Sequence, residues 1–199
     1  MIPGRLRQRT LKQIFNTLRV RSGRFSSGIC RHDPTEIMVF VTNRCNFSCN
    51  TCPFTHASPW SPVPDVPDIP PEKFEQILDT YRGASMVGLV GGEPLLHPQL
   101  DRLITAAAAR SMTVNLSTNG FLLTEERIRS LLNLPIGYIN ISIDAVDAEE
   151  FHRLRGGSRS VYETVISHAA LLGSLKQTAR RPVQVYLSFV TDALNLHRL

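Results

Sequence analysis

Residues 37–52 read IMVFVTNRCNFSCNTC, a strand-like run followed at once by three closely spaced cysteines. The apolar, β-branched segment 37–42 is typical of a parallel strand that is covered on both faces. Cys45, Cys49 and Cys52 follow it with the spacing CxxxCxxC. A loop in this position lies at the carboxyl end of its strand, where open α/β sheets bind their ligands.

The three cysteines are too close together for all of them to join distant segments by disulfides, and they predict a metal site. A 4Fe–4S cluster bound entirely by protein needs four cysteines, so three leave one iron open to a substrate or cosubstrate. Zinc is the alternative, with His56 as a fourth ligand after Cys52. The chain has no second CxxC pair, so the pattern favours iron–sulfur. Cys30 stands apart and is given no role.

Strand-like and helix-like segments alternate along the rest of the chain, which predicts an α/β fold with parallel strands and right-handed crossovers. Proline-rich residues 58–71 predict a loop, and residues 191–199 resemble the start of a further helix. The segments are as follows: strands at 37–42, 86–90, 113–117, 138–143 and 183–190, and helices at 72–81, 100–110, from Thr124, at 148–155 and at 161–176.

Three further loops stand at expected carboxyl ends of strands. Residues 91–94 read GGEP, residues 118–120 read TNG, and Asp144 follows the fourth strand. Glycines at such a turn permit positive φ and close approach to a ligand, and Glu93 supplies a carboxylate. Because the carboxyl ends of parallel strands meet at one edge, we expect these loops and the cysteines to form one site.

Positive charge is concentrated at the N-terminus. Residues 1–32 contain eight of the 22 basic residues and none of the 17 acidic ones. Leu11, Ile14, Phe15 and Leu18 follow helical spacing there. This basic helix fits an anionic membrane, a nucleic acid or a protein partner, or it packs its apolar stripe on its own domain. We expect an arm over 1–33 and a core over 34–199.

The chain shows no apolar run of membrane-spanning length and no apolar core of a secretory signal. We therefore expect a cytoplasmic protein, whose thiols stay reduced.

The motifs together resemble the radical S-adenosylmethionine (SAM) superfamily from about residue 35 onward. CNFSCNTC matches its CxxxCxxC signature, GGEP stands after the second strand, and STNG and ISIDA resemble the ends of the third and fourth. The resemblance implies a partial (β/α)6 TIM-like barrel with a 4Fe–4S cluster at its mouth. It also implies an enzyme that reductively cleaves SAM to a 5′-deoxyadenosyl radical, which abstracts hydrogen from a substrate.

Site roles follow from the same resemblance. Cys45, Cys49 and Cys52 would bind three irons, and the amino and carboxylate groups of SAM would chelate the fourth. Gly92 and Glu93 would line the methionine amine, with Gly91 permitting the close approach.

The remaining implied contacts belong to SAM or the substrate. Ser142 would reach the ribose or carboxylate of SAM, and Thr51 its adenine, although many family members have an aromatic residue at that position. Asn119 and Asp144 would face the same cavity. Arg155, before two glycines, would approach the SAM carboxylate.

The family core has six strands, and about five are expected here. We therefore expect a C-terminally truncated core that is inactive in isolation, with an unknown substrate in peptide modification or cofactor biosynthesis. An electron donor such as flavodoxin or ferredoxin is implied, and there is no clear nucleic-acid signature. The alternative is a truncated, non-catalytic iron–sulfur or zinc module with a basic partner-binding arm.

Overall fold

Five parallel strands form one sheet in the order β1-β2-β3-β4-β5 in a computed structural model that describes residues 10–22, 32–50, 52, 67–179, 181–191 and 196. The strands are β1 (Glu36–Thr42), β2 (Met86–Gly91), β3 (Thr113–Thr118), β4 (Ile136–Ser142) and β5 (Gln184–Ser188). The helices are α1 (Leu11–Ser22), α2 (Pro71–Thr80), α3 (Leu100–Ala109), α4 (Glu125–Asn133), α5 (Ala148–Arg155) and α6 (Arg159–Leu175), with short 3₁₀ turns η3 (Pro94–Leu96) and η4 (Lys176–Thr178).

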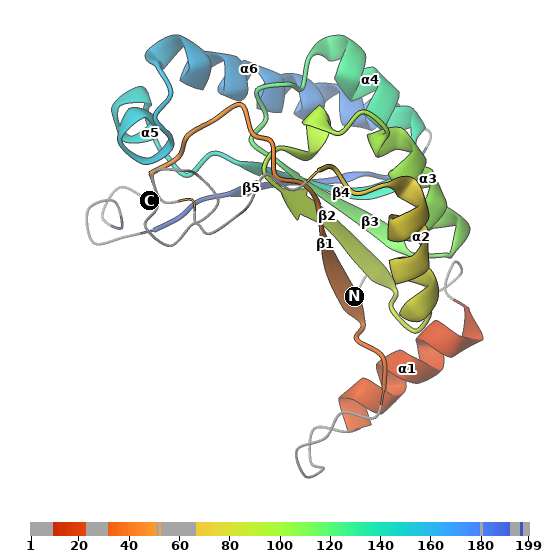
Figure 1. The fold of residues 1–199 in the computed structure, drawn as a ribbon. Coiled ribbons are helices and arrows are strands. Elements are labelled where there is room, and N and C mark those ends of the chain that lie inside the picture. The colour runs from red at the N-terminus through yellow and green to blue at the C-terminus, as the bar shows by residue number, and fades with distance from the viewer. Residues whose placement is uncertain are drawn as a thin grey trace.

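Each strand pairs in parallel with the next one along the chain, from β1 to β5. With crossovers of one hand, sequential order places every crossover helix on the same side of the sheet. Figure 1 shows α2 to α6 on one side of a curved sheet, with the inner face open. The prediction of a partial TIM-like barrel is confirmed.

Strand alternation separates a buried outer face from an open inner one. Val41, Leu89 and Leu116 point toward the helices and are fully buried. The opposite face of β1 carries Met38 and Phe40, which are 63% and 51% exposed. The core therefore lies between sheet and helices, and the inner face is left for a ligand.

The expected segment boundaries agree with the observed ones to within a few residues. Thr124 caps α4 as expected, because its Oγ1 accepts a hydrogen bond from the backbone N–H of Arg127 at 3.2 Å. Gly156 ends α5 in the left-handed conformation, with φ of 73°.

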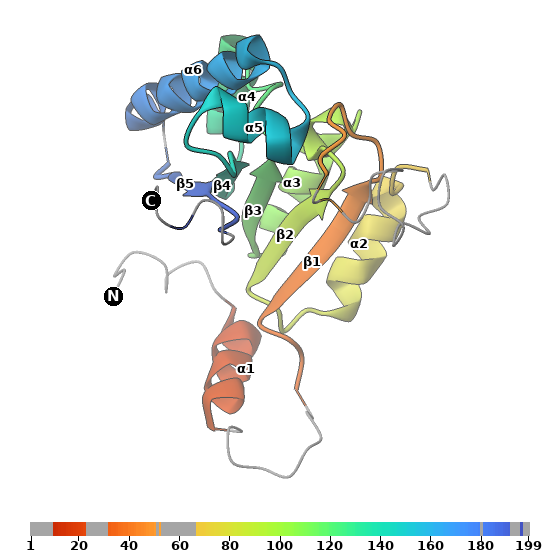
Figure 2. The same cartoon turned by 90° about the vertical axis from the view of Figure 1, so that its left-hand side faces the viewer.

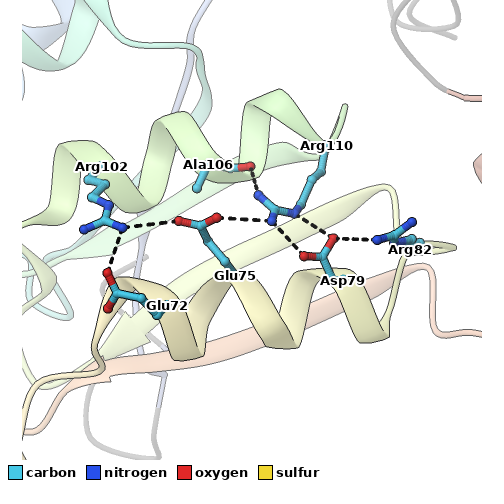
Figure 3. Close-up of polar contacts among 7 residues, drawn as sticks. All are labelled: Glu72, Glu75, Asp79, Arg82, Arg102, Ala106 and Arg110. Atoms are coloured by element: carbon cyan, nitrogen blue, oxygen red, sulfur yellow. Dashed lines mark hydrogen bonds and ion pairs between the residues drawn. The ribbon is translucent and has the colours of Figure 1, made fainter.

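Ion pairs join α2 to α3 on the outside of the barrel (Figure 3). Arg102 contacts Glu72 at 2.8 Å, and Arg110 contacts Glu75 at 3.2 Å and Asp79 at 2.8 Å. Arg110 also donates to the backbone carbonyl of Ala106. The hydrogen bond from Arg110 lowers the pKa of the Asp79 carboxyl. These contacts fix the two helices that cover β2.

Helix α1 forms where its spacing predicted, but three of the four residues of its apolar stripe do not pack on the domain, and the fourth, Ile14, is half-buried. Leu11, Phe15 and Leu18 are exposed, whereas Gln13 and Asn16 are buried. The interpretation in which the stripe covers the chain's own core is wrong. The physical reason is that the two amides bind backbone carbonyls of the domain, which orients the polar side inward.

Several predictions concern residues outside the described ranges, namely Cys30, Thr51, His56 and most of 191–199. The division of the chain at residue 33 stays a prediction. Within the described ranges, no helix has the length and apolarity that a membrane crossing requires.

Candidate cluster and cosubstrate site

The three cysteines of the loop after β1 line one cavity of about 220 Å³. Cys45 is exposed, Cys49 is buried and Cys52 is half-buried. The loop turns tightly, because the backbone N–H of Cys52 donates to the carbonyl of Cys49 at 3.1 Å and that of Phe47 donates to the Cys45 sulfur at 3.4 Å. The cavity also receives the predicted residues Gly91, Gly92, Asn119, Ser142 and Arg155.

The carboxyl end of α5 holds the cysteine loop from outside. Asn50 donates through its backbone N–H to the carbonyl of Leu154 at 3.0 Å and through its side chain to that of Arg153 at 2.8 Å. A Cβ on Gly156 would lie 3.2 Å from the carbonyl oxygen of Ser48. The position of the loop thus depends on a helix about 100 residues away in sequence.

The two glycines after β2 pack against the backbone of the same loop. The N–H groups of Gly92 and Glu93 donate to the carbonyls of Thr42 and Arg44, both at 2.8 Å. Gly91 has φ of 127°, and a Cβ on Gly92 would lie 2.2 Å from the carbonyl oxygen of Arg44. The close approach that these glycines permit is therefore to the chain's own loop, at the wall of the cavity.

Glu93 lies beneath the cavity wall and is fully buried. Its carboxylate accepts hydrogen bonds from the N–H of Leu95 at 3.0 Å, the hydroxyl of Thr118 at 2.8 Å and the N–H of Asn119 at 2.7 Å. Burial raises the pKa of Glu93, and the three hydrogen bonds oppose that shift. In this geometry the carboxylate ties the end of β2 to the end of β3.

Asn119 holds the cysteine loop from the β3 side. Its Nδ2 donates to Oδ1 of Asn46 at 2.8 Å and lies 3.9 Å from the Cys45 sulfur. Its Oδ1 accepts from the N–H of Phe121 at 3.0 Å. Asn119 therefore lines the cavity with both ends of its amide engaged.

Asp144 and Arg155 form a buried ion pair behind the cysteines, with 2.7 Å between Oδ2 of Asp144 and NH1 of Arg155. Asp144 has φ of 59°, a left-handed conformation that aspartate tolerates better than most residues. Its other oxygen accepts from the N–H of Val190 at 3.0 Å. The guanidinium of Arg155 also lies 5.6 Å from the centre of the Phe47 ring. Arg155 reaches the cavity, and Asp144 orients it.

The electrostatics of the thiols combine burial with this cation. Burial raises the pKa of the Cys45 thiol, and it raises that of Cys49 to about 11. The Arg155 charge acts in the opposite direction on both thiols. A positively charged group beside the cysteines suits thiolate ligands and the carboxylate of a ligand.

The donor set fits an iron–sulfur cluster better than a single ion. No three His, Cys, Asp or Glu side chains of the described ranges are arranged around one metal ion. Zinc draws its ligands to about 2.3 Å from one centre, whereas each cysteine of a 4Fe–4S cluster binds a different iron. Three cysteines that line one cavity can supply one ligand to each of three irons, as the second arrangement requires.

Polar side chains on the inner face of the sheet were not predicted from the sequence. Asn140 donates to the hydroxyls of Ser117 at 3.1 Å and Ser188 at 3.2 Å. The rings of Tyr138 and Tyr186 stack with 5.7 Å between centres. In β3 and β4 the strand period of two is the signal that would have found them, because Ser117, Tyr138 and Asn140 alternate with the fully buried Leu116, Ile139 and Ile141. In β5 no such signal exists, because Leu187 between Tyr186 and Ser188 is exposed.

One buried amide oxygen lies on the inner side of β3. The Oδ1 atom of Asn115 is buried and has no hydrogen-bond partner within the described part of the chain. The cysteine cavity is also lined by four residues that were not predicted, namely Asn43, Phe47, Val90 and Ser117, and by Thr118 of the predicted TNG loop.

Comparison with known proteins gives a family match across most of this chain. The family model of the Radical SAM superfamily matches residues 39–179. The chain is 31% identical over 174 residues to a GTP 3′,8-cyclase of Mycolicibacterium smegmatis, covering 82% of this chain and 46% of that protein. It is 30% identical over 123 residues to a GTP 3′,8-cyclase of Corynebacterium glutamicum, covering 58% of this chain and 32% of that protein. The chain thus spans less than half the length of these curated relatives.

Solved structures share the fold at low sequence identity. Streptococcus suis SuiB bound to S-adenosylmethionine aligns with a TM-score of 0.65 at 17% identity, over 83% of this chain and 36% of SuiB. Native anSMEcpe with bound AdoMet aligns with a TM-score of 0.64 at 18% identity, over 81% of this chain and 46% of anSMEcpe.

Proposed function

Because this chain belongs to the radical SAM superfamily, we propose that it is the catalytic core of a radical SAM enzyme. Cys45, Cys49 and Cys52 would hold the 4Fe–4S cluster, and SAM would occupy the cavity between them and Arg155. The observation that carries the proposal is that all three cysteines line one cavity with Gly91, Gly92 and Arg155. When bound, the reduced cluster and SAM supply one-electron cleavage of the sulfonium to a 5′-deoxyadenosyl radical that abstracts hydrogen.

The residues of this chain would orient and enclose the bound groups. Arg155 would present its guanidinium to the SAM carboxylate, since Asp144 holds only one end of it. Asn119 and Glu93 would keep the cysteine loop at the strand ends. Ser142 lines the cavity beside them and would donate to SAM. Thr51 keeps its proposed role near the adenine.

The inner face supports a substrate that is recognised by neutral hydrogen bonds and ring stacking. Amides and hydroxyls stand in neighbouring strands next to the stacked tyrosines Tyr138 and Tyr186. A peptide backbone or a planar heterocycle matches such groups. We propose a substrate of this chemistry, a one-electron donor of the flavodoxin or ferredoxin kind, and a reducing, cytoplasmic location.

The test is anaerobic reconstitution of the chain with iron and sulfide. We expect about four irons per chain, a number set by a 4Fe–4S cluster, and a change in the electron paramagnetic resonance spectrum of the reduced cluster when SAM is added. 5′-Deoxyadenosine should form after reduction.

The test variant is Cys49→Ala, which should lose the cluster and any SAM cleavage. The matched control is Ser174→Ala, at an exposed position of α6, which should retain both. Undiminished SAM cleavage by Cys49→Ala would refute the assignment. Zinc in place of iron, with no spectral response to SAM, would favour the non-catalytic alternative.

A further inference from the structure

Helix α1 is attached to the domain through its polar side. The Nε2 atom of Gln13 donates to the carbonyls of Ala84 at 2.8 Å and Arg110 at 3.2 Å. The Nδ2 atom of Asn16 donates to the carbonyls of Asp33 at 2.9 Å and Gly83 at 3.1 Å. Both side chains are at most 7% exposed. These bonds fix the rotation of the helix, because turning it would leave buried amides and carbonyls unpaired.

The opposite side of α1 is an apolar ridge. Leu11, Phe15 and Leu18 follow one another at i, i+4 and i+7 and are 74%, 62% and 55% exposed. A surface helix ordinarily turns such a stripe toward its own core. Here the stripe points away from the domain, and the clamped amides keep it there. We call these three residues the α1 ridge.

Positive charge accompanies the α1 ridge. Lys12 and Arg19 are exposed and lie seven residues apart, so they share one flank of the helix. Lys12 has an acidic neighbour, Asp33, at 3.8 Å. Arg21 is a further basic residue of the helix, and the flanking sequence within residues 1–32 adds five more basic residues and no acidic one. An occupant of this surface must therefore be apolar where it meets the ridge and anionic around it.

We propose that α1 is a membrane-docking helix that lies in the interface of an anionic lipid bilayer. A helix with Leu and Phe on one side and Lys and Arg beside them has the composition of interfacial helices. Basic residues near an anionic leaflet add electrostatic attraction. A bilayer can take up a protruding apolar ridge without the complementary groove that a protein partner would need. A second copy of the chain is a poor occupant, because two arms of the same charge would repel each other.

Docking in this way leaves the proposed active site accessible. Figure 2 shows α1 beyond the amino ends of β1 and β2, with the loop after β1 at the other end of the strands. The α1 contacts lie on Gly83 and Ala84, immediately before β2. The cysteine cavity lies at the carboxyl ends. A bilayer on the ridge and a substrate in the barrel therefore use opposite ends of the molecule.

The experiment is cosedimentation of the full chain with lipid vesicles. One set contains phosphatidylcholine alone, and the other contains phosphatidylcholine with phosphatidylserine. We expect binding to the anionic vesicles that weakens as salt is raised. The double variant Phe15→Ser, Leu18→Ser should lower the binding constant roughly tenfold or more, because each side chain loses apolar area in the interface. Its urea midpoint should not change, since both side chains are exposed.

The matched control replaces two exposed apolar residues elsewhere, Tyr81→Ser and Ile166→Ser, which are 40% and 38% exposed. This control should bind vesicles as the unmodified chain does. Absence of binding to anionic vesicles, equal binding to both lipid sets, or equal loss in the control variant would each overturn the proposal. Self-association in sedimentation that the ridge variant abolishes, without vesicle binding by the unmodified chain, would assign the ridge to a second copy and overturn it as well.

Discussion

The contact of Gly92 with the cysteine loop leads to a quantitative prediction for Gly92→Ala. A Cβ there would lie 2.2 Å from the carbonyl oxygen and 2.7 Å from the carbonyl carbon of Arg44. Real Cβ contacts do not fall below 3.0 Å, so the backbone must separate by about 0.8 Å. The atoms that must move carry the two hydrogen bonds from Gly92 and Glu93 to the loop.

The magnitude follows from these contacts. Overpacking in a well-packed region costs about 2 kcal/mol, and the two weakened hydrogen bonds together add about 1 kcal/mol. We expect Gly92→Ala to lower the free energy of unfolding by about 3 kcal/mol. For a chain of this size that corresponds to a fall in Tm of about 6–12 °C. Because the displaced backbone leads directly into Cys45, iron content after reconstitution should fall too.

The control is Gly88→Ala in the same strand. A Cβ on Gly88 would lie 3.5 Å from Cγ of Met38, an ordinary contact with a flexible side chain. Its unfolding free energy should change by less than about 1 kcal/mol, and its iron content should match that of the unmodified chain. The assays are urea unfolding followed by circular dichroism, and iron and sulfide analysis. Equal stability and equal iron content in the two variants would refute the reasoning.

Three further predictions concern charge and turn geometry. Arg155→Met should destabilise the fold by about 3–5 kcal/mol in urea unfolding, because it leaves the Asp144 carboxylate buried and unpaired. The double variant Arg155→Met, Asp144→Asn should recover most of this loss, and no recovery would show that the lost ion pair is not the cause. The Asp79 carboxyl has its pKa lowered by Arg110, so its contribution to stability is present above the ordinary aspartate pKa and is lost as the pH falls through the lowered value. Arg110→Met should therefore reduce the loss of stability on acidification. The control Arg129→Met, which breaks an ion pair within one helix, should change the pH dependence of stability less. Urea midpoints measured across acidic pH test the prediction, and the same pH dependence in both variants would contradict it. Gly120→Ala should cost about 1–2 kcal/mol or more in the same assay, because its φ is 82° and a Cβ would lie 2.8 Å from Cγ2 of Ile141; a neutral result would show that the turn can adopt another backbone conformation.

The order of strands and helices could be read from the sequence, because strand and helix periods are local properties of the chain. The strand at 37–42 and the Thr124 cap each depend on residues within one element or turn. The expectation that this strand is covered on both faces is wrong, because helices cover only its outer face and Met38 and Phe40 on the inner face are exposed. The sequence also placed the cysteines and the GGEP and TNG turns at the carboxyl ends of strands. Parallel strands bring such ends together, so most of the cavity lining was predictable without coordinates.

The detailed environment of those residues could not be read in the same way. Glu93 was expected at a ligand, and the structure places it under the cavity wall with three donors from β3 and η3. Gly91 and Gly92 were expected to permit the close approach of a ligand, whereas in the structure their nearest neighbour is the backbone of residues 42–44. Apart from the local bond from Leu95 to Glu93, each of these facts is a contact between segments about 25–50 residues apart, which no local pattern encodes.

The N-terminal helix shows most clearly which features follow from local sequence and which follow from tertiary contacts. A basic helix over residues 11–22 with one apolar stripe could be predicted from the sequence, because the spacing of side chains around a helix is fixed by its period. Which side of that helix faces inward depends on contacts with distant segments. The backbone carbonyls of Ala84 and Gly83 accept hydrogen bonds from the Gln13 and Asn16 amides, so the polar side of the helix lies against the domain. A hydrophobic pattern states what a helix can bury, but the partners offered by distant segments determine what it does bury.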